Sequence, residues 1–308
     1  MKKNVTKRTV GKFNKQEFTL FFIVVFAMAC LFDSCNHKPA SNKITTEAEL
    51  IDQPYGDHDK QKFDIYLPAG RSSKSTPTLF LIHGGGWAAG DKSFYKPEIK
   101  RLQAIFPQMA FVAVGYRLAD GKALTNQFPT QELDVKACIA YIMDNREKYG
   151  ISKRFALYGG SAGAHLAMLF AYKHGHTTYK PAAVVSLVGP GNISTLYNQV
   201  MLTDDPNKSV YFGWFVDAVG GTNEQKPEMC YASSPINFIT AKSPPTLLLY
   251  GEDDTIVPRQ QADELDAKLT AAGVKHIYKL YPGQGHNVQD VIPEINRELT
   301  DFLKIYLK

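Results

Sequence analysis

The 308-residue sequence lacks the features that mark several protein classes. Four cysteines are too few for a disulfide-rich scaffold, and no paired-Cys or Cys–His spacing typical of a zinc site occurs. No internal repeat is present, and no second long apolar run follows residue 32, so the body does not read as an integral membrane protein. With 44% hydrophobic and 21% charged residues, the composition excludes disorder, collagen and coiled coil and favours a folded domain.

Charge gives little evidence for a nucleic-acid partner. The net charge of +5 comes from 35 basic and 30 acidic residues, and residues 1–34 alone hold six basic and two acidic side chains. The remaining chain is nearly neutral, so no nucleic-acid partner is expected.

The N-terminus has the pattern of an export signal. A basic stretch precedes an uncharged apolar run from Phe18 to Phe32, which is shorter than the about 20 residues of a membrane span. The run ends in Ser34-Cys35, which resembles a bacterial lipoprotein cleavage site. The resemblance implies cleavage before Cys35 and acylation of that cysteine, so that lipid chains anchor the protein to a membrane.

Three alternatives stay open at this signal: Cys30 as the acceptor, ordinary secretion, and an uncleaved anchor. Asp33 departs from the lipoprotein pattern. The expected organisation is a signal peptide over 1–34, a lipidated Cys35 with a polar tether over 35–61, and a folded domain over 62–308. The expected location is the cell envelope, on the periplasm-facing side or the cell surface.

The body alternates short apolar runs with longer helical patterns, which predicts an α/β fold. Continuous apolar strands of this kind indicate a mostly parallel central sheet with helices on both faces. Strands are predicted at 78–83, 111–116, 155–158, 183–187, 246–250 and 276–281, with an earlier one at 63–67, and helices at 96–106, 131–148, 162–174, 260–272 and 288–306. Residues 190–240 interrupt this alternation and are rich in aromatics, which predicts a helical insertion that either covers a site or packs peripherally.

Ser161 is the candidate nucleophile. Gly159-Gly160-Ser161-Ala162-Gly163 lies between a predicted strand and a predicted helix, where Gly-x-Ser-x-Gly forms a tight turn that exposes the serine. The start of a helix also favours developing negative charge. A second glycine run, His83-Gly84-Gly85-Gly86-Trp87, follows another strand and offers backbone N–H groups to an oxyanion. Its spacing does not fit a dinucleotide-binding loop.

A serine nucleophile needs a histidine base that a carboxylate orients. After Ser161 the sequence offers Asp253 and Asp254 behind one strand and His286 behind the next. Such loops lie at the carboxyl ends of the strands, where open α/β sheets place their sites. The order serine, acid, histidine is the one that this architecture uses.

Together these motifs resemble an α/β-hydrolase of the carboxylesterase and lipase group, near its hormone-sensitive-lipase-like and acetyl-xylan or feruloyl esterase branches. The segments 112–118 and 128–135 share the resemblance, which covers residues 62–306. It implies a triad of Ser161, Asp254 and His286, because the family pattern Gly-x-x-Asp-x-x-Val-Pro selects Asp254 over Asp253. It also implies an oxyanion hole formed by the N–H groups of Gly85, Gly86 and Ala162. Gly160 stands where hormone-sensitive-lipase-like members carry Asp, which favours the polysaccharide-esterase branch.

The other polar residues are expected to be structural. His83 is expected to support the glycine loop, His165 to pack in the core, and Arg117 to pair with Asp134, the last as the resemblance implies. His174 and His176 are not expected to bind metal. Cys138 is expected to be a buried thiol, and a Cys138–Cys230 disulfide stays open.

The expected function is that of a serine esterase that works through an acyl-enzyme, without cofactor or metal. Its expected substrates are small esters or acylated oligosaccharides, such as plant polysaccharide fragments. The alternatives are a peptidase, an aryl formamidase, or a lipoprotein that binds ligands without catalysis. The oligomeric state is not predicted.

Overall fold

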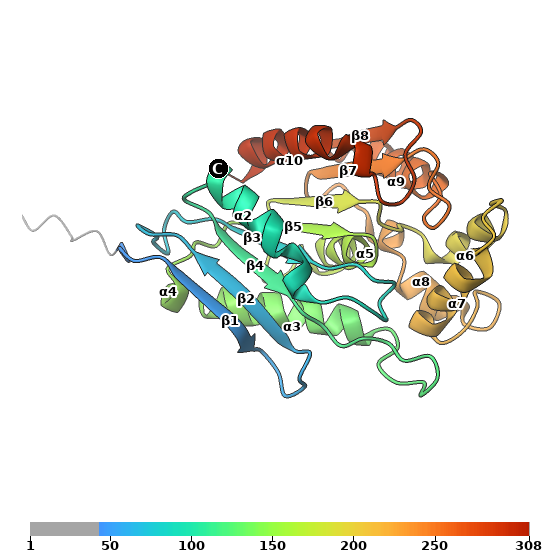
Figure 1. Cartoon of the computed structure of the whole chain (residues 1–308), viewed down its shortest axis with the longest axis horizontal. Helices are drawn as coiled ribbons and strands as arrows, with labels where there is room; N and C mark the ends of the chain where they lie inside the picture. The colour runs from blue at the N-terminus through green and yellow to red at the C-terminus, as the bar shows by residue number, and fades with distance from the viewer. Residues whose placement is uncertain (1–42, 308) are drawn as a thin grey trace, which may run out of the picture. The chain divides into compact units, whose positions relative to one another are not determined.

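The computed structural model describes residues 43–307, which fold around one eight-stranded sheet (Figure 1). The strand order is β1-β2-β4-β3-β5-β6-β7-β8. Strands β3 to β8 are parallel to one another, and β2 pairs antiparallel with both β1 and β4. The bounds are β1 Ala48–Pro54, β2 Lys62–Leu67, β3 Thr78–Ile82, β4 Ala110–Val114, β5 Phe155–Gly160, β6 Ala183–Leu187, β7 Thr246–Gly251 and β8 His276–Tyr281. The predicted mostly parallel sheet is confirmed.

Helices cover both faces of the sheet, as predicted. The α-helices are α2 Lys96–Ile105, α3 Thr130–Asp144, α4 Arg146–Tyr149, α5 Ala162–Leu169, α6 Ile193–Met201, α7 Lys208–Val219, α8 Pro227–Ala232, α9 Gln260–Ala271 and α10 Ile292–Tyr306. Helical turns of the 3-10 type are η1 Lys92–Tyr95, η3 Pro235–Phe238 and η4 Gln289–Val291, and η2 Phe170–His174 is a π-helical turn. The helix predicted over 131–148 is therefore two helices, and the one over 162–174 ends in a π-helical turn.

Alternating side chains of each central strand enter two separate cores. In β3, Phe80 and Ile82 pack with residues of α3, α5 and α9, whereas Leu79 and Leu81 pack with residues of α2 and α10. Full burial of such a side chain contributes about 1.5–3 kcal/mol. Because both faces of the strand are buried, its sequence is a continuous apolar run without alternation.

The boundary between tether and domain is wrong in the prediction. Residues 48–54, assigned to the tether, form β1, which pairs with β2 from Ala48 opposite Leu67 to Pro54 opposite Lys62. The Ile44 N–H also donates to the Arg71 carbonyl at 2.9 Å. The strand lies at the edge of the sheet and is only half buried, so backbone pairing stabilises it and its sequence carries no apolar pattern. The predicted signal peptide, Cys30 and Cys35 lie outside the described residues.

The segment between β6 and β7 is helical, as predicted, and contains α6, α7, α8 and η3. Figure 1 shows α6 to α8 beyond the arrowheads of β5 and β6, at the carboxyl edge of the sheet. Over residues 43–307, no helix combines the length and the apolar character that a membrane crossing requires.

Candidate active site

Ser161 stands at a sharp turn between β5 and α5. Its backbone has φ of 53° and ψ of −123°, an unfavourable conformation for a residue with a side chain. Two glycines allow the turn to close. A Cβ on Gly159 would lie 2.3 Å from the Gly163 carbonyl carbon, and one on Gly163 would lie 1.9 Å from the Ile82 oxygen. The predicted strand–serine–helix turn is therefore present.

The side chains of Ser161, His286 and Asp254 form a continuous hydrogen-bonded chain. His286 Nε2 lies 2.9 Å from Ser161 Oγ, and His286 Nδ1 lies 2.7 Å from Asp254 Oδ2. A carboxylate only accepts, so Nδ1 carries the proton toward Asp254 and the neutral ring leaves Nε2 free to accept from the serine hydroxyl. The geometry suits proton removal from Ser161.

The structure distinguishes between the two adjacent aspartates. Asp254 is 4% exposed, and its Oδ1 accepts the N–H groups of Ile256 at 2.9 Å and Val257 at 2.8 Å. Asp253 is exposed, and its own N–H donates to the Gln284 carbonyl at 2.9 Å. Asp254, and not Asp253, therefore orients His286.

The glycine loop after β3 lies against Ser161. A Cβ on Gly84 would be 2.8 Å from the Gly160 carbonyl oxygen and 3.2 Å from Ser161 Cβ. Gly85 and Gly86 have φ of 113° and 57°, which side chains disfavour. Among the hydrogen bonds of residues 43–307, none uses the backbone N–H of Gly85, Gly86 or Ala162 as donor. Three donors close to Ser161 thus stay available to a ligand.

Two residues in the segment that follows β4 hold the glycine loop by hydrogen bonds. The Tyr116 hydroxyl donates to the His83 carbonyl at 2.7 Å, and the two rings stack with centroids 4.2 Å apart. The Ala119 N–H donates to the Trp87 carbonyl at 2.9 Å. His83 Nδ1 also bonds the Gly84 carbonyl, and burial lowers the pKa of His83 to about 4, so the ring is neutral at neutral pH. The structure shows His83 as a support of the loop, as expected.

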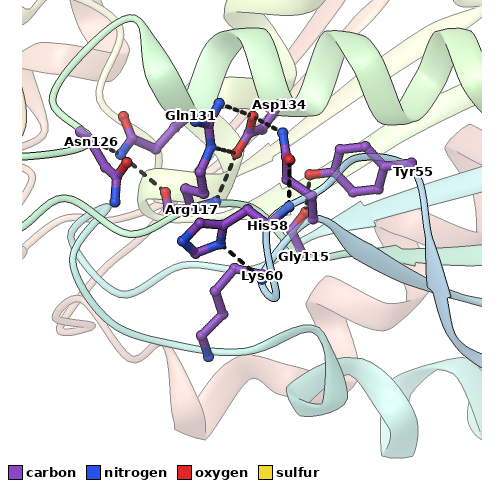
Figure 2. Close-up of polar contacts among 9 residues, drawn as sticks. Tyr55, His58, Lys60, Gly115, Arg117, Asn126, Gln131 and Asp134 are labelled. Carbon is purple, nitrogen blue, oxygen red and sulfur yellow. Dashed lines mark hydrogen bonds and ion pairs between the residues drawn. The ribbon is translucent and has the colours of Figure 1, made fainter.

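A polar network anchors the segment that carries Tyr116 and Ala119 (Figure 2). Asp134 accepts two bonds from the Arg117 guanidinium, at 2.7 and 2.9 Å, and one from the Arg117 backbone N–H at 2.9 Å. The Gln61 amide donates a fourth bond to Asp134 at 2.8 Å. The expected Arg117–Asp134 pair is present, and it stabilises the support of the glycine loop.

A cavity of about 480 Å³ opens in front of Ser161. Its lining is Gly85, Gly86, Trp87, Ala88, Ala89, Ser161, Pro190, Trp214, Phe215, Ile256, Val257 and His286. Apart from Ser161 and His286, these side chains are apolar. A larger cavity of about 720 Å³ lies between β1, β2 and α2 and contains none of the triad residues, so it is separate from the site.

The insertion covers the site. Trp214 and Phe215 of α7 line the cavity, and a Cβ on Gly86 would lie 3.4 Å from the Trp214 ring. Of the two interpretations of residues 190–240, covering the site is therefore correct. The sequence analysis did not single out Trp214 as a site residue, although the aromatic content of the insertion was a signal for it.

The remaining candidates lie outside the cluster of Ser161, His286 and Asp254. Cys138 and Cys230 are both buried free thiols, so they form no disulfide, and burial raises the pKa of Cys138. His174 Nε2 bonds the Glu132 carboxylate at 2.6 Å. Within the described part of the chain, no group of three or more His, Cys, Asp or Glu side chains is placed to hold a metal ion.

A serine at a strand–helix elbow, with its histidine and aspartate at the carboxyl edge of a mostly parallel sheet, defines the α/β-hydrolase fold. The chain belongs to the BD-FAE family, whose model matches residues 63–269.

Two curated esterases of Mycobacterium tuberculosis are similar to the chain. Esterase LipQ is 25% identical over 84% of this chain and 62% of its own length, and esterase LipC is 27% identical over 75% and 58%. The chain thus spans about three fifths of these relatives. A solved truncated carbohydrate esterase from gut microbiota has a TM-score of 0.71 at 22% identity, and the match covers 85% of this chain and 97% of that one. This likeness supports the fold.

Proposed function

We propose that the protein is a carboxylic ester hydrolase with Ser161 as nucleophile, His286 as base and Asp254 as orienting acid. The observation that carries the proposal is the continuous bond chain of 2.9 and 2.7 Å beside an apolar cavity. Esterase names among the similar curated proteins support it.

The reaction follows from the positions of these atoms. Ser161 Oγ attacks the ester carbonyl carbon while His286 Nε2 takes the hydroxyl proton, and Asp254 stabilises the resulting imidazolium. The N–H groups of Gly85, Gly86 and Ala162 donate hydrogen bonds to the carbonyl oxygen and stabilise its developing negative charge. His286 then gives its proton to the departing alcohol, and the acyl group stays on Ser161. A water that His286 deprotonates attacks this acyl-enzyme, and His286 returns the proton to Ser161 Oγ as the bond between Oγ and the acyl carbon breaks and the acid leaves.

Hydrolysis of a chromogenic phenyl acetate by the purified full-length chain tests the proposal. Ser161→Ala should lower kcat by at least about 10³-fold, because nucleophile removal leaves only binding and oxyanion stabilisation. Ser75→Ala is the matched control, since Ser75 is exposed and its side chain bonds only the Ser72 hydroxyl. Equal rates in wild type and Ser161→Ala would refute the assignment of Ser161 as the nucleophile.

The proposed physiological substrates are acylated plant polysaccharide fragments. Support comes from the structural likeness to a carbohydrate esterase and from Gly160, which departs from the hormone-sensitive-lipase-like pattern. Acid release from acetylated xylan, feruloylated oligosaccharides, short lipids and formylkynurenine should be fastest with the first two. Preference for formylkynurenine would favour the aryl formamidase alternative, and cleavage of peptides would favour a peptidase.

We further propose export and a lipid anchor at Cys35, which rest on the sequence pattern alone. Cys35→Ser should move the protein from the membrane fraction to the soluble fraction of the native host. Cys30→Ser is the matched control and should leave fractionation unchanged. If Cys30→Ser releases the protein from the membrane fraction and Cys35→Ser does not, Cys30 is the acylated residue.

A further inference from the structure

His165 is a buried imidazole that the proposed reaction does not use. It lies on α5, one turn after Ser161, and is 2% exposed. Its Nδ1 lies 3.1 Å from Trp87 Nε1, and its Nε2 lies 2.6 Å from the Ser233 carbonyl oxygen. Trp87 directly follows the glycine loop, and Ser233 belongs to the insertion after α8. One ring therefore connects three segments that surround the cavity.

The partners determine the tautomer of His165. An indole N–H can only donate, so Nδ1 must be the unprotonated acceptor. A carbonyl oxygen can only accept, so Nε2 carries the hydrogen. Burial lowers the pKa of His165 to about 4, which keeps the ring in this neutral form at neutral pH.

The Trp87 side chain packs between α5, the helix that follows Ser161, and α7 of the insertion. Its ring meets His165 edge-on at 5.1 Å and Phe215 of α7 at 5.9 Å. The Trp87 backbone has φ of 61°, a left-handed conformation that a large side chain adopts only when its surroundings hold it. The residues directly before it, Gly85 and Gly86, supply two of the proposed oxyanion donors.

We propose that His165 is a positioning residue. Its hydrogen bond holds Trp87 in place, so that the N–H groups of Gly85 and Gly86 stay directed at the oxyanion. It acts through Trp87, since His165 itself does not line the cavity. The kinetic consequence rests on the proposed ester hydrolysis. If these N–H groups point away from the oxyanion, the transition state is stabilised less, while binding of the neutral ester changes little. We therefore expect kcat to fall while KM stays nearly constant.

Two isosteric substitutions separate the two bonds. In His165→Asn the amide oxygen replaces Nδ1 and still accepts from Trp87, but the bond to Ser233 is lost. In His165→Gln the amide nitrogen replaces Nε2 and still donates to the Ser233 carbonyl, but the bond to Trp87 is lost. His165→Leu removes both bonds. His176→Asn is the control, because His176 is exposed.

The proposal predicts a rescue by asparagine. His165→Asn should keep kcat within about threefold of wild type, whereas His165→Gln and His165→Leu should lose at least about tenfold, a change of about 1.4 kcal/mol in the barrier. KM should stay within about twofold in all three. If asparagine is as impaired as leucine, or glutamine is the better of the two amides, the assignment to Trp87 is wrong. If His165→Leu does not fold, the comparison of asparagine with glutamine decides.

An NMR readout is independent of ester hydrolysis. The chain has only two tryptophans, so Trp214→Phe assigns the two indole N–H resonances of the labelled full-length protein. The Trp87 resonance should shift toward that of a free indole in His165→Gln and stay close to wild type in His165→Asn. A Trp87 resonance that does not move in His165→Gln overturns the inference. Inactive wild-type protein with the expected shifts would refute the proposed function and leave the Trp87–His165 bond standing.

Discussion

The two carboxylate oxygens of Asp254 have separate partners, and His286 takes one of them. Oδ2 lies 2.7 Å from His286 Nδ1, while Oδ1 accepts the N–H groups of Ile256 and Val257. These backbone bonds prevent the carboxylate from rotating, so the imidazole is held in the orientation that Ser161 needs.

Replacement of this carboxylate by an amide should remove most of the activity. In Asp254→Asn the amide N–H opposes Nδ1–H, favours the wrong tautomer and no longer stabilises the imidazolium. We expect a loss of about 10²–10⁴-fold in kcat on a chromogenic acetate, by analogy with the same change in other triads. Asp253→Asn is the matched control and should stay within about threefold. If Asp253→Asn lowers kcat more than Asp254→Asn does, Asp253 is the acid of the triad.

The turn at Ser161 should not tolerate a methyl group at Gly163. The Cβ would lie 1.9 Å from the Ile82 oxygen and 2.5 Å from the His83 oxygen, so backbone must move. Gly163→Ala should therefore lower both the Tm and the kcat. Gly213→Ala is the matched control in α7, where a Cβ meets nothing within 4 Å and helix propensity predicts a gain of up to about 1 kcal/mol. An unchanged Tm in Gly163→Ala would contradict the described elbow.

Trp214 should influence which esters bind. It is 40% exposed and lines the cavity, so its ring is available to a large alcohol or acyl group. Trp214→Ala should raise KM for phenyl and feruloyl esters at least about threefold and leave KM for ethyl acetate almost unchanged. Phe94→Ala is the control, because Phe94 is 70% exposed and does not line the cavity. If Trp214→Ala changes KM equally for small and large esters, Trp214 does not determine which esters bind.

Stability should fall as the pH drops from about 6.5 to about 4. Burial lowers the pKa of His83 and His165 from 6.5 to about 4, so in this window the unfolded chain binds protons that the folded chain does not. Each histidine destabilises the fold by up to about 3 kcal/mol at the acid end, and the effect is absent above pH 6.5. The lowered pKa of Asp52 acts only below its ordinary value of 3.8.

Urea unfolding at a series of pH values measures this dependence. His165→Asn removes one of these groups and should reduce the loss of unfolding free energy between pH 6.5 and 4, while His83 and the lowered pKa of Glu132 keep part of it. His176→Asn should leave it unchanged. A dependence that is identical in wild type and His165→Asn would contradict the burial of a neutral His165.

Local patterns were sufficient to predict the order of the strands from β2 to β8 and the sharp turn at Ser161. Both signals lie within a few neighbouring residues. The strands β3 and β5 are buried on both faces, so each is a continuous apolar run, and the turn at Ser161 is marked by the glycines that its close backbone contacts require. The edge strand β1 was missed for the opposite reason. It is held by hydrogen bonds to β2, and such bonds leave no pattern in side-chain hydrophobicity.

The sequence by itself determined the α/β architecture, the Ser161 turn and the glycine loop, since their information lies within short segments. Only the tertiary structure decided that Asp254 meets His286, that Trp214 covers the loop, and that His165 joins Trp87 to the insertion. Ser161 and His286 are 125 positions apart. Distances across such separations depend on how the whole sheet and its helices pack, and no local pattern encodes them.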